Sequence, residues 1–470
     1  MKSTAFLTVA ALAPAIQAQA GMYQQCGGIG FSGSTTCVSG AYCSKINDWT
    51  GGGAGTTTAP STSIPTTLQT SAAASTGASP VTTAAPSGSG TPTSGDSSNP
   101  LAGKGFYANP FYASEVISIA APSLAAAGSS ALAAKATEVA KVGTFYWLRV
   151  ADESESDVRA KVPTIATFAK DVQKQNAAGA NLVLPLVVYD LPERDCAALA
   201  SNGELSLANN GSALYTDYIN QIAAQIKAFP DVTFLLVIEP DSLANLVTNL
   251  NVQKCANAAT AYKTLVTYAI KTLNMKNVIM YLDAGHGGWL TLGKLGWQAN
   301  LGPAADLFAG LYKDAGSPAA VRGLVTNVAN YNAWTIATCP SYTQGDSNCD
   351  EKRYINALAP LLKAKGFDAH FMTDTSRNGV QPTKQQAWGD WCNLIGTGFG
   401  IRPSSKTDDP LLDAWVWVKP GGECDGTSDT SAVRYDAHCG LADALKPAPE
   451  AGKWFQAYFE QLLVNANPAF

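Results

Sequence analysis

Acidic residues stand where the apolar runs of this 470-residue sequence end. Residues 237–245 read VIEPDSLAN, so an apolar run stops at Glu239, Pro240 and Asp241. An unpaired carboxylate is costly to bury, and we therefore expect Asp241 to face a cleft. Other runs end at or near further acids, which we expect at the same cleft: Asp190, Asp195, Asp283, Asp374, Glu423 and Asp425. Such a group of carboxylates can bind a divalent metal, carry out general acid–base catalysis, or form plain polar surface.

The residues around these acids favour acid–base chemistry on a sugar. The acids come singly from different runs, the chain has only three histidines, and it contains neither a CxxC pair nor an HExxH motif, so we expect no metal site and no cofactor. Flat aromatic faces stack on the C–H faces of sugar rings, and aromatic residues fall near the same run ends: Trp147, Tyr189, Trp289, Trp297, Trp388 and Trp391. Core packing is the alternative for any one of these tryptophans.

Hydrolysis of a glycosidic bond requires a carboxyl group that protonates the leaving oxygen. Near neutral pH such a group needs a raised pKa, which a dry pocket or a neighbouring carboxylate can produce. The stretch LLVIEP precedes Asp241 and gives it a dry approach, and Asp195 in YDLPERDC is the candidate like-charged neighbour.

Seven short β-like runs must position these residues. They lie at 144–150, 182–190, 234–241, 278–285, 323–329, 370–374 and 414–421. Amphipathic segments such as ALYTDYINQIAAQIKAF and NAATAYKTLVTYAIKTLN separate them. Runs that are apolar on both faces and alternate with helices indicate parallel βα units. Seven units predict an α/β fold with a closed barrel, whose chemistry lies at the carboxyl ends of the strands, and an open doubly wound sheet is the alternative.

The composition and the first hundred residues indicate where the protein works. A net charge of -5 argues against nucleic acid and anionic membranes as partners. Residues 1–20 have the pattern of a secretory signal peptide, with Lys2, an apolar stretch and the site Ala18-Gln19-Ala20, so we expect a secreted, extracellular protein. Residues 50–100 are rich in Ser, Thr and Pro and predict a linker, O-glycosylated or bare. Residues 101–470 have the composition of a globular domain.

Five long motifs resemble the fungal glycoside hydrolases of family 6, of the cellobiohydrolase II type. They are VVYDLPERDCAALASNGE, LLVIEPDSLANLVTN, MYLDAGHGGW, GDWCNLIGTGFGIRP and WVWVKPGGECDGTSD, and the likeness runs from about Phe106 to the C-terminus. The resemblance implies a distorted seven-stranded parallel β/α barrel with tunnel-forming loops. It also implies a monomeric exo-acting cellulase that binds cellulose and cello-oligosaccharides, hydrolyses β-1,4-glucosidic bonds with inversion, and releases cellobiose from non-reducing ends.

The resemblance assigns a role to each catalytic position. It implies that Asp241 is the proton donor and that Asp195 keeps Asp241 protonated and takes part in the proton route from water. Tyr189 is similar to the tyrosine that distorts the sugar at the cleavage point, and Ser201 to the serine that holds the catalytic water. Asp425 matches the carboxylate debated as the base.

Further positions match the substrate contacts of the family. Lys419 and Glu423 match ligands of the sugar before the cut. The resemblance gives sugar platforms and a supporting network: Trp147, Trp391, Trp289 and Trp297, with Asp283 and His286. A structural role is the alternative for His286, and the long spacing between Trp289 and Trp297 leaves the place of the distal platform open.

Two other functions remain open from the sequence. The loop after Tyr189 and the loop between Trp391 and Asp429 are full length, which favours a roofed tunnel and exo action. An endo-β-1,4-glucanase of the same family is the alternative among hydrolases. A non-catalytic carbohydrate-binding protein is the alternative from another class, and the retained acids argue against it.

The cysteines are read first as disulfides, because secretion permits them. The resemblance pairs Cys196 with Cys255 and Cys392 with Cys439, and it leaves Cys424 as a buried thiol. The spacing of Cys339 and Cys349 permits a local surface bridge.

Residues 21–49 resemble the fungal cellulose-binding module of family 1. Tyr23 and Trp49 match two of its aromatic residues, and three of its cysteines are matched by Cys26, Cys37 and Cys43. After Trp49 the stretch TGGGAG stands where a further aromatic residue and a Gln-Cys ending belong. We therefore expect a module that lacks about one strand, leaves Cys37 without its partner, and binds crystalline cellulose poorly.

Overall fold

The structure of the protein is a computed structural model. It describes residues 99–148, 161–293, 296–297 and 300–470, with the strand backbones at 25–27, 41–45 and 51–55. Side chains at 292–297 are not described, and the predicted signal peptide and almost all of the predicted linker lie outside the described residues. The chain divides into two compact units, Met1–Thr93 and Ser94–Phe470, each described by itself.

The first unit contains a sheet of three short strands: β1 (Gln25–Gly27), β2 (Ala41–Lys45) and β3 (Gly51–Gly55). β3 pairs antiparallel with both of the others. The expectation that the last strand is missing is therefore wrong for the backbone, because the glycine-rich stretch after Trp49 supplies it. This strand reads GGGAG and brings neither an aromatic side chain nor a cysteine. The side chains of Tyr23, Trp49, Cys26, Cys37 and Cys43 lie outside the described residues.

The second unit is built on a parallel sheet. Its strands are β4 (Gly105–Phe106), β5 (Tyr146–Leu148), β6 (Leu182–Val188), β7 (Thr233–Ile238), β8 (Val278–Asp283), β11 (Val321–Thr326), β12 (His370–Asp374) and β13 (Leu412–Val416). The order is β13-β12-β11-β8-β7-β6, with β4 beside the beginning of β6 and β5 beside its end. All seven predicted runs are strands, and the two-residue β4 is the one that the sequence did not indicate.

The strands are apolar on both faces because each face meets a different part of the core. In β7, Phe234, Leu236 and Ile238 belong to the large cluster between the sheet and the helices. Leu235 and Val237 belong to a second cluster, which fills the inside of the curled sheet with Tyr281 and others. Successive side chains of a strand point to opposite faces, so an unbroken apolar run is what this double burial requires.

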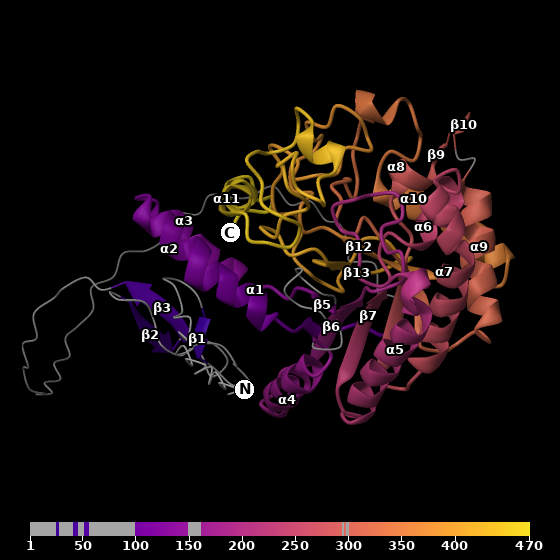
Figure 1. Cartoon of the computed structure of the whole chain (residues 1–470), viewed down its shortest axis with the longest axis horizontal. Coiled ribbons are helices and arrows are strands. Elements are labelled where there is room, and N and C mark those ends of the chain that lie inside the picture. The colour runs from indigo at the N-terminus through magenta and orange to yellow at the C-terminus, as the bar shows by residue number, and fades with distance from the viewer. Residues whose placement is uncertain are drawn as a thin grey trace, which may run out of the picture. The chain divides into compact units, whose positions relative to one another are not determined.

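Helices cover the outside of the sheet and its ends. Those that pack on the outer face are α4 (Thr164–Ala177), α5 (Gly211–Lys227), α7 (Gln253–Thr272), α9 (Leu301–Asp314) and α10 (Glu351–Ala364). Figure 1 shows α5, α7, α9 and α10 on the right-hand side of the view and α4 near the bottom centre. Shorter elements follow the strand ends: η3 (Leu207–Asn209), α6 (Leu243–Thr248), α8 (Gly287–Leu290), β9 (Leu292–Gly293), β10 (Gly296–Trp297), η4 (Ser341–Thr343) and η5 (Ala437–Gly440). The two amphipathic segments named above are α5 and α7.

A smaller core joins the two ends of the second unit. Four N-terminal elements, α1 (Pro110–Glu115), η1 (Val116–Ala120), α2 (Ala121–Ala126) and α3 (Ser130–Val139), share this core with α11 (Gln456–Val464). The chain between β12 and α11 consists mostly of loops, drawn in orange and yellow in Figure 1. Among the helices of the described residues, none has both the length and the apolar composition needed to cross a bilayer.

The sheet curls into an incomplete barrel. No strand ladder joins β5 to β13 in the described part of the chain. Two hydrogen bonds bridge this seam: Phe145 N donates to Trp417 O at 3.1 Å, and Trp147 Nε1 donates to Val418 O at 2.8 Å. The predicted barrel is confirmed as a curled sheet of seven parallel strands with the two-residue β4 added to it, and its edges at β5 and β13 meet through single hydrogen bonds.

Candidate active site

A cavity of about 840 Å³ lies at the carboxyl ends of the strands. The five positions with an expected catalytic role all line it: Tyr189, Asp195, Ser201, Asp241 and Asp425. Six of the expected substrate contacts line it as well: Trp147, His286, Trp289, Trp391, Lys419 and Glu423. The side chain of Trp297 lies outside the described residues.

Three of the acids at strand ends do not line this cavity, contrary to the expectation of one shared cleft. Asp190 is buried and forms an ion pair of 3.0 Å with Arg194. Asp283 accepts the backbone N–H of Asp241 at 3.0 Å and so orients its neighbour from behind. Asp374 accepts the backbone N–H of Lys419 at 3.0 Å. Each carboxylate contacts a group behind the cavity wall, the Arg194 side chain for Asp190 and backbone N–H groups for Asp283 and Asp374. A run-end pattern cannot distinguish such a place from one that lines the cavity.

A tight turn aims Asp241 into the cavity. Glu239 and Asp241 have positive φ angles of 50° and 58°, which non-glycine residues rarely adopt and which often occur at functional sites. The Glu239 carboxylate is buried and accepts the backbone N–H groups of Asp190 and Leu191 at 3.2–3.3 Å, so it ties the end of β7 to the loop after β6. The turn that follows β7 therefore places Asp241 at the cavity.

The surroundings of Asp241 favour its protonated form. Burial raises the pKa of Asp241 well above its usual value, and the negative charges of Asp195, Asp283 and Asp425 raise it further, against the opposing charge of Lys419. Among the described residues, no donor forms a hydrogen bond to its carboxyl oxygens. A raised pKa favours the protonated carboxyl group, which can give its proton to a bound oxygen.

Asp195 is placed as the charged partner of the pair. Burial raises its pKa, while hydrogen bonds from the hydroxyls of Tyr189 and Ser201 and the charge of Arg194 favour the carboxylate. The Tyr189 hydroxyl donates to Asp195 Oδ2 at 2.8 Å. Because Asp195 has these donors and Asp241 has none, a single proton shared by the two resides on Asp241.

Asp425 is held as a carboxylate by a buried cation. Arg377, 1% exposed, donates from Nη1 to both carboxylate oxygens at 2.7 Å, and Lys419 Nζ lies 3.7 Å from Oδ1. Burial alone would raise the pKa of Asp425, but Arg377 and Lys419 together bring it below its usual value. A carboxylate with a lowered pKa is a weak base, so Asp425 is poorly suited to take a proton from water.

Aromatic rings line the cavity on several sides. Trp147 packs edge-to-face on Tyr189, with ring centroids 5.0 Å apart, and Trp391 lies 5.5 Å from the ring of His438. Trp289 donates from Nε1 to Thr248 Oγ1 at 2.7 Å. Trp388 is different, because it is 2% exposed and does not line the cavity. For Trp388 the expectation of a cleft-facing ring is wrong, and the core-packing alternative is correct.

Two loops meet over the cavity, and we call them the first roof loop, residues 191–205, and the second roof loop, residues 427–440. Leu199 N donates to Asp436 Oδ2 at 2.9 Å, and the Arg434 guanidinium donates to Ala200 O. Ser201 and His438, one from each loop, line the cavity. The contact between the loops holds the segment that carries Asp195 and Ser201.

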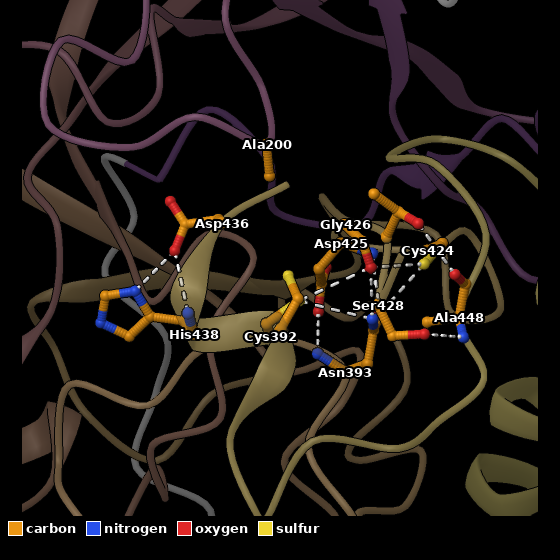
Figure 2. Close-up of a disulfide and its surroundings, with 12 residues drawn as sticks. Ala200, Cys392, Asn393, Cys424, Asp425, Gly426, Ser428, Asp436, His438 and Ala448 are labelled. Atoms are coloured by element: carbon orange, nitrogen blue, oxygen red, sulfur yellow. Dashed lines mark hydrogen bonds and ion pairs between the residues drawn. A yellow bond between two sulfur atoms is a disulfide. The ribbon is translucent and has the colours of Figure 1, made fainter. Parts of the chain in front are cut away.

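Disulfides anchor both roof loops. Cys196 is bonded to Cys255, which ties the first roof loop to α7, and Cys392 is bonded to Cys439, which ties the second to the segment after Trp391. Figure 2 shows Asp436 and His438 on one side of the second bridge and Asp425 with Asn393 on the other. Both expected pairings and the buried thiol of Cys424 are confirmed, and Cys339 is bonded to Cys349, which the spacing permitted but did not decide.

The sequence reasoning missed several residues that shape the site, notably Arg377, Asn332, Arg434 and Asp436. Arg377 stands three residues after β12, so a search for basic residues behind strand ends would have found it. The other three lie in irregular loops and carry no periodic pattern. Within the described ranges, no group of three or more His, Cys, Asp or Glu side chains is arranged to hold a metal ion.

Known proteins are similar to this chain in sequence and in fold. Residues 101–466 match the glycosyl hydrolases family 6, and residues 22–49 match the fungal cellulose binding domain. The chain is 62% identical over 476 residues to 1,4-beta-D-glucan cellobiohydrolase C of Emericella nidulans, covering 100% of this chain and 99% of that protein. It is similar to the solved cellobiohydrolase II of Humicola insolens in complex with glucose and cellotetraose, with a TM-score of 0.74 and 55% identity over 79% of this chain and 100% of that one. The catalytic core of the cellobiohydrolase Cel6A from Chaetomium thermophilum has the same TM-score and 59% identity, over 79% of this chain and 99% of that one.

Proposed function

Because the chain belongs to family 6 of the glycosyl hydrolases, we propose that it is a secreted cellulase that hydrolyses the β-1,4-glucosidic bonds of cellulose with inversion and releases cellobiose from non-reducing ends. The observation that carries the proposal is the pairing of Asp241 with Asp195 at the carboxyl end of the sheet. Binding alone needs no acid with a raised pKa, so this pair favours a hydrolase over a non-catalytic carbohydrate-binding protein.

Asp241 supplies the proton in the proposed reaction. Its carboxyl group protonates the glycosidic oxygen while the bond from that oxygen to the anomeric carbon breaks. A water molecule attacks the anomeric carbon from the opposite face, which inverts its configuration. Asp241 is left as a carboxylate, and it recovers a proton before the next cycle.

Asp195 and Ser201 handle the attacking water. The Ser201 hydroxyl supports the Asp195 carboxylate, and both side chains line the cavity. They orient the water, and its proton passes toward Asp195, directly or through a second water. Asp425 does not act as the base in this scheme, because Arg377 and Lys419 hold its pKa low. Its charge instead balances these two cations beside the substrate.

The remaining lining residues bind the sugar chain. Tyr189 is held in place by the hydrogen bond from its hydroxyl to Asp195, and its ring presses on the sugar at the cleavage point. Lys419 and Glu423 bind the sugar before the cut, and rings along the cavity stack on the others: Trp147, Trp289 and Trp391. The hydrogen-bonded roof loops favour exo action over the endo action of an open cleft.

Sugar release from amorphous cellulose, followed by early-time NMR of the products, tests the proposal. We expect cellobiose as the main product, with α-cellobiose appearing first. The β anomer as the first product would exclude inversion, random shortening of the chains would indicate an endoglucanase, and the absence of soluble sugar would indicate a binding protein.

A further inference from the structure

A chain of buried hydrogen bonds lies behind the cavity wall and ends on His286. Trp388 Nε1 donates to Asn332 Oδ1 at 2.8 Å. Asn332 Nδ2 donates to Glu351 Oε1 at 2.7 Å and lies 3.1 Å from His286 Nδ1. Gly287 N donates to the same Glu351 oxygen at 3.0 Å. The four side chains are each at most 6% exposed, so water does not substitute for these partners.

The donors in this series of hydrogen bonds fix the orientation of the Asn332 amide and the position of the proton on the His286 ring. An indole N–H can only donate, so the Asn332 atom that faces Trp388 is the carbonyl oxygen. The Asn332 amide nitrogen therefore faces both Glu351 and His286. That nitrogen has two hydrogens and no acceptor site, so His286 Nδ1 must accept, and the ring proton must be on Nε2.

Glu351 supports the same arrangement. Its Oε1 accepts from a backbone N–H, which cannot change direction, and from the second hydrogen of Asn332 Nδ2. A rotation of the Asn332 amide by half a turn would place its oxygen against this carboxylate and its nitrogen against the indole N–H. The contact with the indole would place two N–H donors against each other at any pH, so Trp388 fixes the orientation of the amide.

The second ring nitrogen of His286, Nε2, takes no part in this series of hydrogen bonds. The residue precedes α8 and lines the cavity, and no hydrogen bond to Nε2 forms within the described part of the chain. Burial lowers the pKa of His286 to about 4, so the ring stays neutral above that pH. A neutral ring with its proton on Nε2 offers one N–H donor and no charge.

We propose that Trp388, Asn332 and Glu351 are positioning residues that hold His286 as a neutral Nε2–H donor, aimed at an oxygen of the sugar chain in the cavity. The part that concerns the sugar rests on the proposed function. The protonation of the ring itself does not, and it can be measured without substrate.

NMR of the full-length protein with ¹⁵N-labelled histidine tests the protonation directly. The chain has only three histidines, so His286→Gln identifies its signals by subtraction. At pH 6 we expect the proton of His286 on Nε2. A proton on Nδ1, or a doubly protonated ring, would overturn the proposal, whether or not the protein hydrolyses cellulose.

Asn332→Asp tests the positioning role. Both carboxylate oxygens of the new Asp side chain accept hydrogen bonds. The oxygen that faces His286 therefore requires an N–H on Nδ1. The ring proton then moves to Nδ1, or the ring takes up a second proton and becomes charged. We expect KM for a soluble cello-oligosaccharide to rise about fivefold, the value of one hydrogen bond, with kcat changed less. Asn257→Asp on the exposed face of α7 is the matched control and should change neither quantity. An unchanged ring tautomer in a folded Asn332→Asp protein would contradict the proposal, and if that variant does not fold, the wild-type spectrum still decides.

An independent observation concerns Asn210, Gly211 and Ser212. They form the only Asn-x-Ser/Thr motif of the sequence with a residue other than proline in the middle. Asn210 and Ser212 are exposed, and Asn210 precedes α5 without a capping hydrogen bond from its side chain. The middle position accepts only glycine, because a Cβ there would lie 2.6 Å from Ser206 O. The motif is therefore accessible, and its amide is uncommitted.

We infer that Asn210 carries an N-linked glycan when the protein passes through a eukaryotic secretory pathway. Asn210 Nδ2 forms a bond to C1 of the first N-acetylglucosamine and gives up a proton. The bond from that carbon to the phosphate of a lipid-diphosphate-linked oligosaccharide breaks, and the lipid diphosphate leaves. The glycan would stand beside the first roof loop, since Leu207 in η3 donates its backbone N–H to Glu193 Oε1 at 3.0 Å.

Peptide mapping of protein collected from the medium of a fungal host tests this inference. Treatment with peptide-N-glycosidase should convert Asn210 to Asp and add about 1 Da to its peptide. Ser212→Ala should abolish the modification, and Asn209→Gln should preserve it. An unmodified Asn210 peptide from secreted protein would overturn the inference, whereas absence of the protein from the medium would contradict the proposed secretion instead.

Discussion

At the scale of single residues, Asp241 and Asp425 differ in the charges beside them. Asp241 is surrounded by three carboxylates and one cation, Lys419, whereas Asp425 accepts hydrogen bonds from a buried arginine, Arg377. Both side chains line the same cavity, yet the pKa of Asp241 is raised and the pKa of Asp425 is lowered. The neighbours of each carboxyl group, rather than its position at a strand end, therefore decide its role.

Asp241→Asn should nearly abolish hydrolysis while ligand binding persists. The amide has almost the shape of the acid but has no proton to give, and a positioned acid contributes about two to four powers of ten in rate. Single-turnover kinetics on a soluble cello-oligosaccharide, with calorimetric binding as the control, measures both effects. A variant that retained more than about a tenth of the activity would show that another group is the acid.

Asp195→Asn should change the pH profile as well as the rate. Asp241 must be protonated to act, so activity falls as the pH rises through its pKa. Removing the negative charge of Asp195 lowers that pKa, and the high-pH limb of kcat/KM should move to lower pH. The rate loss should be smaller than for Asp241→Asn. A high-pH limb at the wild-type position would remove Asp195 from the role of charged neighbour.

At the scale of elements, the roof loops depend on close packing around one glycine. A Cβ at Gly426 would lie 2.6 Å from Cys439 Sγ and 2.8 Å from the Cβ of Ala200, so it would press on the second disulfide and on the first roof loop together. Neither contact involves the flexible end of a side chain. The loops must therefore separate if this position gains a side chain.

Gly426→Ala should lower both thermal stability and activity. We expect a loss of about 1–3 kcal/mol in the free energy of unfolding, as for other overpacked sites. Gly302→Ala in α9 is the matched control, since a Cβ there meets nothing within 4 Å, and it should be neutral or stabilising by up to about 1 kcal/mol. Thermal unfolding and hydrolysis of soluble substrate compare the two, and equal behaviour of both variants would refute the packing argument.

The elements also show what the sequence can predict. The seven main strands were found because burial on both faces leaves an unbroken apolar run, which is visible locally. The seam between β5 and β13 was not found, because two hydrogen bonds between segments about 270 residues apart leave no pattern in either segment. Trp388 and Trp391 lie three residues apart in one loop, and only the fold decides that the first is buried and the second faces the cavity.

At the scale of the whole molecule, the N-terminal unit and the catalytic unit should act separately. The last strand of the small unit has a backbone but no aromatic side chain, and Cys37 has no partner in the sequence pattern. So small a domain depends on its bridges, and losing one costs about 2–5 kcal/mol. Pull-down on microcrystalline cellulose should therefore be nearly equal for the full chain and for a chain that begins at Leu101. A several-fold stronger pull-down of the full chain would show that the module binds despite its changed end.

The hydrogen bonds between the two roof loops also have a topological consequence. In the proposed function, the joined loops and the sheet beneath them enclose the polymer that occupies the cavity. A strand inside a ring can leave only by sliding out at an end, unless the ring opens. Linear glucans can be threaded in this way, whereas a cyclic glucan has no end to insert. The proposed enclosure would thus sort polymers by whether they have a free end, before any hydrogen bond to a sugar is made.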